Sequence, residues 1–245
     1  VVVMAYFEGN DLNDSWQFKQ ARDAGETLYS INNADRQPWE YLVTFQMALW
    51  LRDSMTAQQH TSDCPYPVHD TNGTPLAFFG DFLSISTVDE PMLTESAIYA
   101  VTRDVILQTA EQTRAHDAIF VLAFIPHKAH VYWPLLDDAT RAAMASQFSA
   151  AQLTEDGIRN ASGISSEETI ARLDANMDAQ RDTLAALAEE NNFLFLDFTP
   201  AMQDAASSGE MVYFISDTHW NQRGHDIARE QLRQFLREHH LVASE

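Results

Sequence analysis

VVVMAYFEGND, residues 1–11, decides the fold: an unbroken apolar run from Val1 to Phe7 ends in the polar tetrapeptide Glu8-Gly9-Asn10-Asp11. Continuous apolar character is typical of a strand that is buried on both faces, as in a parallel sheet. A strand that ends in Gly-Asn-Asp can direct the Asn10 amide into a cleft, where it can donate a hydrogen bond to an oxyanion. The alternative for Asn10 is a turn residue that satisfies local backbone groups.

Three more apolar runs follow along the chain, and three segments with helical spacing of apolar residues lie among them. The runs cover residues 118–125, 193–197 and 211–215, and helical spacing recurs over 98–105, 170–187 and 228–239. This alternation predicts an α/β fold with a doubly wound parallel sheet in three α/β/α layers, similar to flavodoxin. Ligands bind such sheets at the carboxyl ends of the strands.

A carboxylate and an imidazole follow the last apolar run, in the segment Asp217-Thr218-His219-Trp220-Asn221. Asp217 can hold one ring nitrogen of His219 and leave the other free to take a proton from a nucleophile. Trp220 can form a wall beside the imidazole. The alternative is an Asp that caps the last helix and a His that only packs.

Residues 13–95 do not follow the regular alternation of strand and helix patterns. An apolar segment at 38–52 predicts a helix, and 76–87 predicts two short strands around Gly80-Asp81. We interpret 13–95 as an insertion that caps the active edge of the sheet.

Composition narrows the classes of function. The chain has 245 residues, 45% of them hydrophobic, and 36 acidic residues against 15 basic ones give a net charge of −21. A field of this sign repels phosphate backbones and anionic membranes, which argues against nucleic acid as a partner. No apolar stretch is long enough for membrane insertion. Cys64 is alone, so an internal disulfide and a cysteine-based metal cluster are excluded within these residues.

The segments around Asn10 and Asp217/His219 together resemble the SGNH (GDSL-type) hydrolase family. The Asp-x-His-Trp-Asn form is similar to the branch that contains alginate O-acetylation proteins, and residues 126–132 (PHKAHVY) are similar to a Pro-x-Lys…Tyr loop of that branch. The resemblance implies that Asn10 lies in the oxyanion hole with Gly9 beside it, and that Asp217 and His219 are triad members. It also favours a location outside the cytoplasm.

One block of the family is missing. No Gly-Asp-Ser occurs in the chain, and Gly80-Asp81-Phe82 has Phe at the nucleophile position. We therefore expect one SGNH-hydrolase-like domain over residues 1–245 whose N-terminal part, with the nucleophile, is missing. The rival interpretation is a domain that never had the serine.

The middle loop supplies further candidates for substrate binding. Lys128 is one of two lysines in an acidic chain and is expected to pair with a carboxylate or touch substrate. Tyr132 and Trp133 can stack on a sugar ring, or else fill the core under a loop. His127 and His130 lack the His-Glu-x-x-His context of a zinc site.

These observations favour a serine-type ester hydrolase or acetyltransferase acting on O-acyl groups of a carbohydrate. The substrate would be a small-molecule or polysaccharide ester, with neither cofactor nor metal; the oligomeric state stays open. The first alternative is an inactive SGNH-like carbohydrate-binding module. A weaker one is a metal-dependent hydrolase that uses Asp217, His219 and His127.

Overall fold

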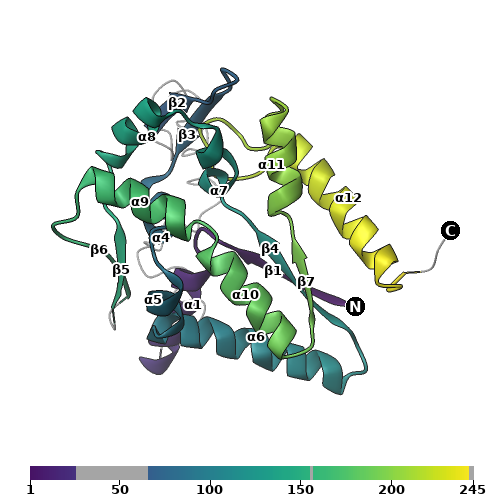
Figure 1. The fold of residues 1–245 in the computed structure, drawn as a ribbon. Helices are drawn as coiled ribbons and strands as arrows, with labels where there is room; N and C mark the ends of the chain where they lie inside the picture. Colours follow the sequence, from purple (N-terminus) through teal and green to yellow (C-terminus); the bar gives the residue numbers. More distant parts are fainter. Residues whose placement is uncertain (26–65, 155–156, 243–245) are drawn as a thin grey trace, which may run out of the picture.

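The computed structural model describes residues 1–25, 66–154 and 157–242 (Figure 1). Its strands are β1 (Val2–Phe7), β2 (Tyr66–His69), β3 (Pro75–Phe78), β4 (Phe120–Ile125), β5 (Ala151–Thr154), β6 (Gly157–Asn160) and β7 (Leu194–Asp197). Its helices are α1 (Asp11–Asp23), α4 (Gly80–Ile85), α5 (Glu90–Thr94), α6 (Ala97–Ala115), α7 (Lys128–Tyr132), α8 (Asp138–Ala145), α9 (Ser166–Asn176), α10 (Ala179–Glu190), α11 (Thr199–Ser207) and α12 (Gln222–Glu238), with a 3-10 turn, η2, at Trp133–Leu135.

The central sheet is parallel and has the order β1-β4-β7. Its strands are three of the four apolar runs, and β4 lies in the middle, where the side chains from Phe120 to Phe124 are buried. Helices α6 and α10 cover one face, and α12 covers the other (Figure 1). The prediction of a parallel α/β/α sandwich is confirmed.

The α12 layer does not extend over β1. Val3 and Ala5 pair in register with Val121 and Ala123, so they point to the same face of the sheet. Val121 is fully buried there, whereas Val3 is 41% exposed. Among the described residues, β1 also has no strand partner on its outer edge.

Two expected strands are wrong. Residues 211–215 do not join the sheet; their backbone turns back and meets the chain again through an isolated bridge between Tyr213 and Trp220. Residues 76–87 are not a hairpin, because Gly80-Asp81 begins helix α4 after β3 ends at Phe78. The hairpin lies one strand earlier: β2 pairs with β3 around a turn in which Asp70 accepts hydrogen bonds from the N–H groups of Asn72 and Thr74.

The expected insertion at 13–95 is described in part. Helix α1 begins at Asp11 and packs against α6, with Leu12 and Trp16 buried in the core. The helix expected at 38–52 lies outside the described residues. In the part of the chain that the structure describes, no helix is both long and apolar enough to cross a bilayer.

Candidate active site

A cavity of about 480 Å³ lies between the end of β1 and the loop before α12. Asn10 and His219 both line it, although 209 positions separate them in the chain. Parallel strands bring their carboxyl ends to one edge of a sheet, which explains how the two side chains come to share a wall. Phe7, Phe82, Ile125, Tyr213, Thr218, Trp220 and His225 complete the lining.

Asp217 and His219 form a hydrogen-bonded pair, of which His219 lines this cavity. Asp217 Oδ1 lies 2.5 Å from His219 Nδ1 and also accepts the backbone N–H of His219 at 2.8 Å. The imidazole is 81% exposed, and Nε2 has no hydrogen bond to a described residue. Partial burial raises the pKa of the Asp217 carboxyl, but the N–H and ring of His219 and the charge of Lys128 lower it below its usual value overall. Asp217 is therefore an anion at neutral pH that orients the imidazole.

The loop that carries this pair is fastened from several sides. Asn221 caps α12 by accepting the N–H groups of Arg223 and Gly224. Its Nδ2 donates to the carbonyls of Met211 and Tyr213, which closes the base of the loop. The side chain of Asn221 therefore holds the shape of this loop, although residues 211–215 form no strand of the sheet.

Lys128 also stabilises the loop that carries Asp217 and His219. It is only 3% exposed, and its Nζ donates to the carbonyl oxygens of Ala77 and Ile215. The ammonium group thus joins β3 to the segment before Asp217. The expectation that Lys128 touches substrate is wrong, because its side chain is buried; its charge instead lowers the pKa of Asp217.

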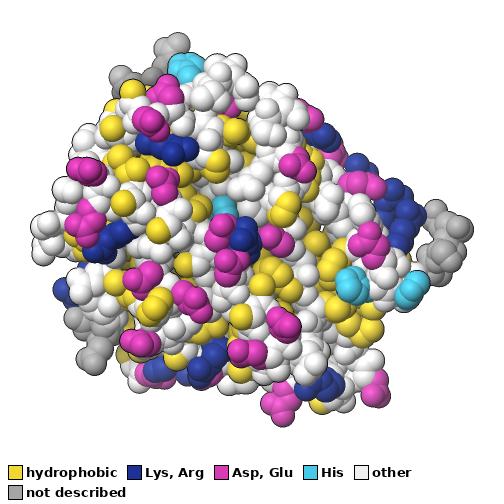
Figure 2. All heavy atoms as spheres, viewed as in Figure 1, with side chains coloured by type: hydrophobic (Ala, Val, Ile, Leu, Met, Phe, Trp, Pro, Cys, Tyr) yellow, Lys and Arg dark blue, Asp and Glu magenta, His cyan; other side chains and the backbone are white. Residues whose placement is uncertain are grey.

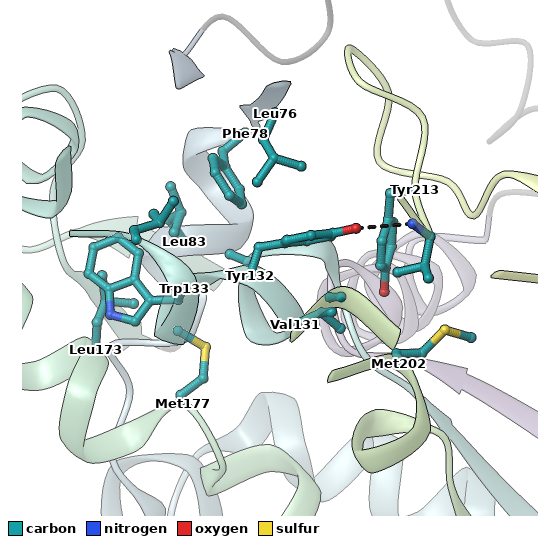
Figure 3. Close-up of a cluster of buried hydrophobic side chains, with 14 of the residues drawn as sticks. Leu76, Phe78, Leu83, Val131, Tyr132, Trp133, Leu173, Met177, Met202 and Tyr213 are labelled. Carbon is teal, nitrogen blue, oxygen red and sulfur yellow. Dashed lines mark hydrogen bonds between the residues drawn. The ribbon is translucent and has the colours of Figure 1, made fainter. Parts of the chain in front are cut away.

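Tyr132 and Trp133 are core residues, so the expectation of a sugar-stacking platform is also wrong. Both side chains are at most 2% exposed. The Tyr132 hydroxyl accepts the N–H of Val212 (Figure 3). The Trp133 indole donates to Asp174. The alternative, that they fill the core under a loop, is correct.

Asn10 sits where β1 becomes α1. Its Nδ2 donates to Asp14 Oδ2 at 2.8 Å, which uses one of the two amide hydrogens and fixes the plane of the amide. Asp11 accepts the N–H of Phe7 and so holds the bend. A Cβ on Gly9 would lie 2.8 Å or less from ring atoms of both Phe7 and Phe82, so only glycine lets these rings approach the bend.

A buried charged network missed by the sequence analysis supports this bend. Glu8 is 1% exposed, and its carboxylate accepts both His130 Nδ1, at 2.8 Å, and the backbone N–H of His127. His130 Nε2 contacts Asp178 Oδ1 at 2.9 Å, where the expected helix over 170–187 divides into α9 and α10. Burial lowers the pKa of His130, but Glu8 and Asp178 raise it to about 9 overall. The ring is therefore a cation between two carboxylates at neutral pH.

His127 lies 2.6 Å from Ser86 and resembles a catalytic dyad, but its protonation excludes that role. Its Nδ1 accepts backbone N–H groups from Ala129 and His130, so the single proton of the neutral ring resides on Nε2. Nε2 then donates to Ser86, which donates to the carbonyl of Phe82. Burial lowers the pKa of His127 to about 4, which keeps the ring neutral.

The metal alternative finds no support in this geometry. Within residues 1–25, 66–154 and 157–242, no three His, Cys, Asp or Glu side chains are grouped to hold a metal ion. His127 is completely buried and committed to Ser86 and the start of α7, so it does not join Asp217 and His219.

Residues 162–245 match a family model described as "SGNH hydrolase-like domain, acetyltransferase AlgX". This third of the chain is SGNH hydrolase-like. The match includes Asp217, His219 and Trp220, so it confirms the resemblance to the alginate-acetylation branch of the SGNH family.

Comparisons with solved structures and with curated proteins give weaker similarity. A solved structure, the O-acetyltransferase domain of Pseudomonas putida AlgJ, aligns with 21% identity and a TM-score of 0.39 over 58% of this chain. The chain spans 40% of the length of that protein. No curated protein matches the sequence.

Proposed function

We propose that this chain carries the acid–base half of an SGNH-type ester-processing site. The observation that carries the proposal is the single cavity lined by both Asn10 and His219. One side supplies an imidazole oriented by a carboxylate, and the other supplies an amide donor. Acyl transfer needs both, a base for the nucleophile and a donor for the oxyanion.

In the first half-reaction, a seryl hydroxyl from outside these 245 residues attacks the acyl carbonyl. His219 Nε2 takes the hydroxyl proton while Asp217 stabilises the imidazolium. The carbonyl electrons move to oxygen, and the second Asn10 amide hydrogen donates to that oxyanion. When the intermediate collapses, the alcohol leaves with the proton from His219, and the acyl group stays on the serine.

In the second half-reaction, an incoming hydroxyl gives its proton to His219 and attacks the acyl-serine. The intermediate then collapses, the bond between the acyl group and the serine breaks, and the seryl oxygen leaves with the proton from His219. Water as the attacker makes the protein an esterase, and a sugar hydroxyl makes it a transferase. The family description names an acetyltransferase, so we favour an O-acetyl group carried by a carbohydrate. We also favour a location of the protein outside the cytoplasm, on the basis of the same resemblance.

A second candidate function is a carbohydrate-binding module without catalysis. One observation favours it: no serine is among the described residues that line the cavity. The nucleophile would have to enter from beside Asn10, where the outer edge of β1 is open among the described residues.

His219→Ala in the full-length protein should lower kcat/KM for p-nitrophenyl acetate by about 10⁴-fold or more, because the proton relay is lost. Asn10→Ala should lower it by about 10²- to 10³-fold, which is the usual effect of removing one oxyanion donor. Spectrophotometric release of p-nitrophenol measures both effects.

His116→Ala is the matched control, because this histidine is exposed at the end of α6 and does not line the cavity. It should retain wild-type turnover. A fluorophosphonate probe separates the two candidate functions: the enzyme is labelled on a serine and loses labelling with His219→Ala. Absence of labelling in the folded wild-type protein would favour the binding module.

A further inference from the structure

A second, larger cavity adjoins the first. It has a volume of about 700 Å³ and shares Asn10 and Phe82 with the cavity that contains His219. The Phe82 ring is fixed there by edge-to-face contacts with Phe7 and Phe79. The two cavities are therefore neighbours on either side of one aromatic partition, and the proposed chemistry uses only one of them.

Unpaired carboxamides distinguish this second cavity. Asn13 and Gln17 follow Asn10 at spacings of three and four along α1, which places all three side chains on one face of the helix. Asn160 reaches the same cavity from β6, which packs against α1. None of the side chains of Asn13, Gln17 and Asn160 has a hydrogen-bond partner among the described residues.

Three carboxamides without a hydrogen-bond partner in the described part of the chain suit a polyhydroxylated ligand. Each offers two N–H donors and a carbonyl acceptor, and a sugar hydroxyl both donates and accepts. The exposed carboxylate of Asp81, which also lines the cavity, adds acceptors. Arg159 also lines the cavity, so the charges of the lining itself nearly balance, whereas the net charge of −21 of the chain opposes a polyanion; acidic side chains are spread over the face seen in Figure 2. The lining therefore fits neutral sugar rings better than phosphates or uronates.

We propose that this cavity is a subsite for neutral sugar residues of the chain that bears the ester. The inference rests on the proposed function, because Asn10 then places the reacting acyl group in one cavity and the next sugar ring in the other. Asn13, Gln17 and Asn160 recognise the hydroxyl groups of the sugar, and Phe79 and Phe82 contact the apolar faces of its rings.

The test is a binding measurement. Xylohexaose, mannohexaose and cellopentaose are titrated into the full-length protein by isothermal calorimetry, with a galacturonate hexasaccharide as the anionic arm. At least one neutral oligosaccharide should bind. The triple variant Asn13→Ala/Gln17→Ala/Asn160→Ala should weaken that binding by about 10- to 100-fold, since three hydrogen bonds are lost.

Gln20→Ala is the matched control, because Gln20 is an exposed carboxamide on the same helix but does not line the cavity. Its affinity should equal that of the wild type. Binding of no neutral oligosaccharide, binding of the anionic one alone, or equal affinity of the triple variant and the wild type would each overturn the inference. The measurement needs no turnover, so its failure is distinct from failure of the p-nitrophenyl acetate test.

Discussion

Gly224 lies in the first turn of α12, directly against the loop that carries His219. A Cβ at this position would lie 2.4 Å from the carbonyl oxygen of Val212 and 2.9 Å from the Cβ of Trp220. Backbone and Cβ atoms cannot swing aside as the end of a long side chain can. The close approach of helix and loop therefore requires glycine here.

Gly224→Ala should destabilise the protein by about 1–3 kcal/mol, the usual cost of overpacking. Urea denaturation followed by circular dichroism measures this effect. The neighbouring exposed substitution Gln222→Ala should change stability by less than about 0.5 kcal/mol. If both variants unfold at the same urea concentration, α12 does not depend on close contact with the loop.

The sequence predicted local pairs of residues well and distant ones poorly. Asp217 and His219 are two positions apart, so their contact could be predicted from one short segment. Glu8 and His130 are 122 positions apart, and only the pairing of β1 with β4 brings them together. Lys128 was misjudged for the same reason, because its carbonyl partners, Ala77 and Ile215, are distant from it in the sequence.

At the scale of elements, runs of apolar residues predicted three of the sheet strands but misassigned the fourth run. Residues 211–215 are as apolar as the others, yet their backbone groups are satisfied outside the sheet: Asn221 donates to the carbonyls of Met211 and Val212, and the N–H of Val212 donates to the Tyr132 hydroxyl. Burial pattern alone does not distinguish a strand from one arm of a closed loop.

Glu8 links β1, α7 and the junction of α9 with α10, so its substitution should affect all of these elements together. Glu8→Gln keeps the shape of the side chain but leaves the His130 cation without its buried anion. We expect a loss of about 3–5 kcal/mol, as for breaking a buried ion pair. Chemical denaturation at neutral pH measures it.

Asp182→Asn provides the comparison, because Asp182 also pairs with a cation, Arg181, but is 65% exposed. Exposed pairs contribute about 0–1 kcal/mol. A loss for Glu8→Gln no larger than this would show that the buried network does not hold the bend at Asn10.

For the whole molecule, the two buried histidines should set how stability depends on pH. The His130 pKa is raised from 6.5 to about 9 in the folded chain. The folded state therefore holds this proton more tightly, and the stabilisation is complete below about pH 6.5 and is lost as pH rises through 9. The His127 pKa is lowered from 6.5 to about 4, so the unfolded state takes up this proton first and stability falls as pH drops from 6.5 to 4.

Together these opposite shifts predict that the free energy of unfolding is largest near pH 6.5 and declines on both sides. Denaturation from pH 4 to 10 at constant ionic strength measures the curve, and constant salt keeps the repulsion among the excess acidic residues comparable. His130→Gln should flatten the alkaline limb, because the group that loses its proton there is gone, whereas His116→Ala should leave both limbs in place. A wild-type curve that stays level from pH 6.5 to 10 would mean that His130 is not held as a cation between Glu8 and Asp178.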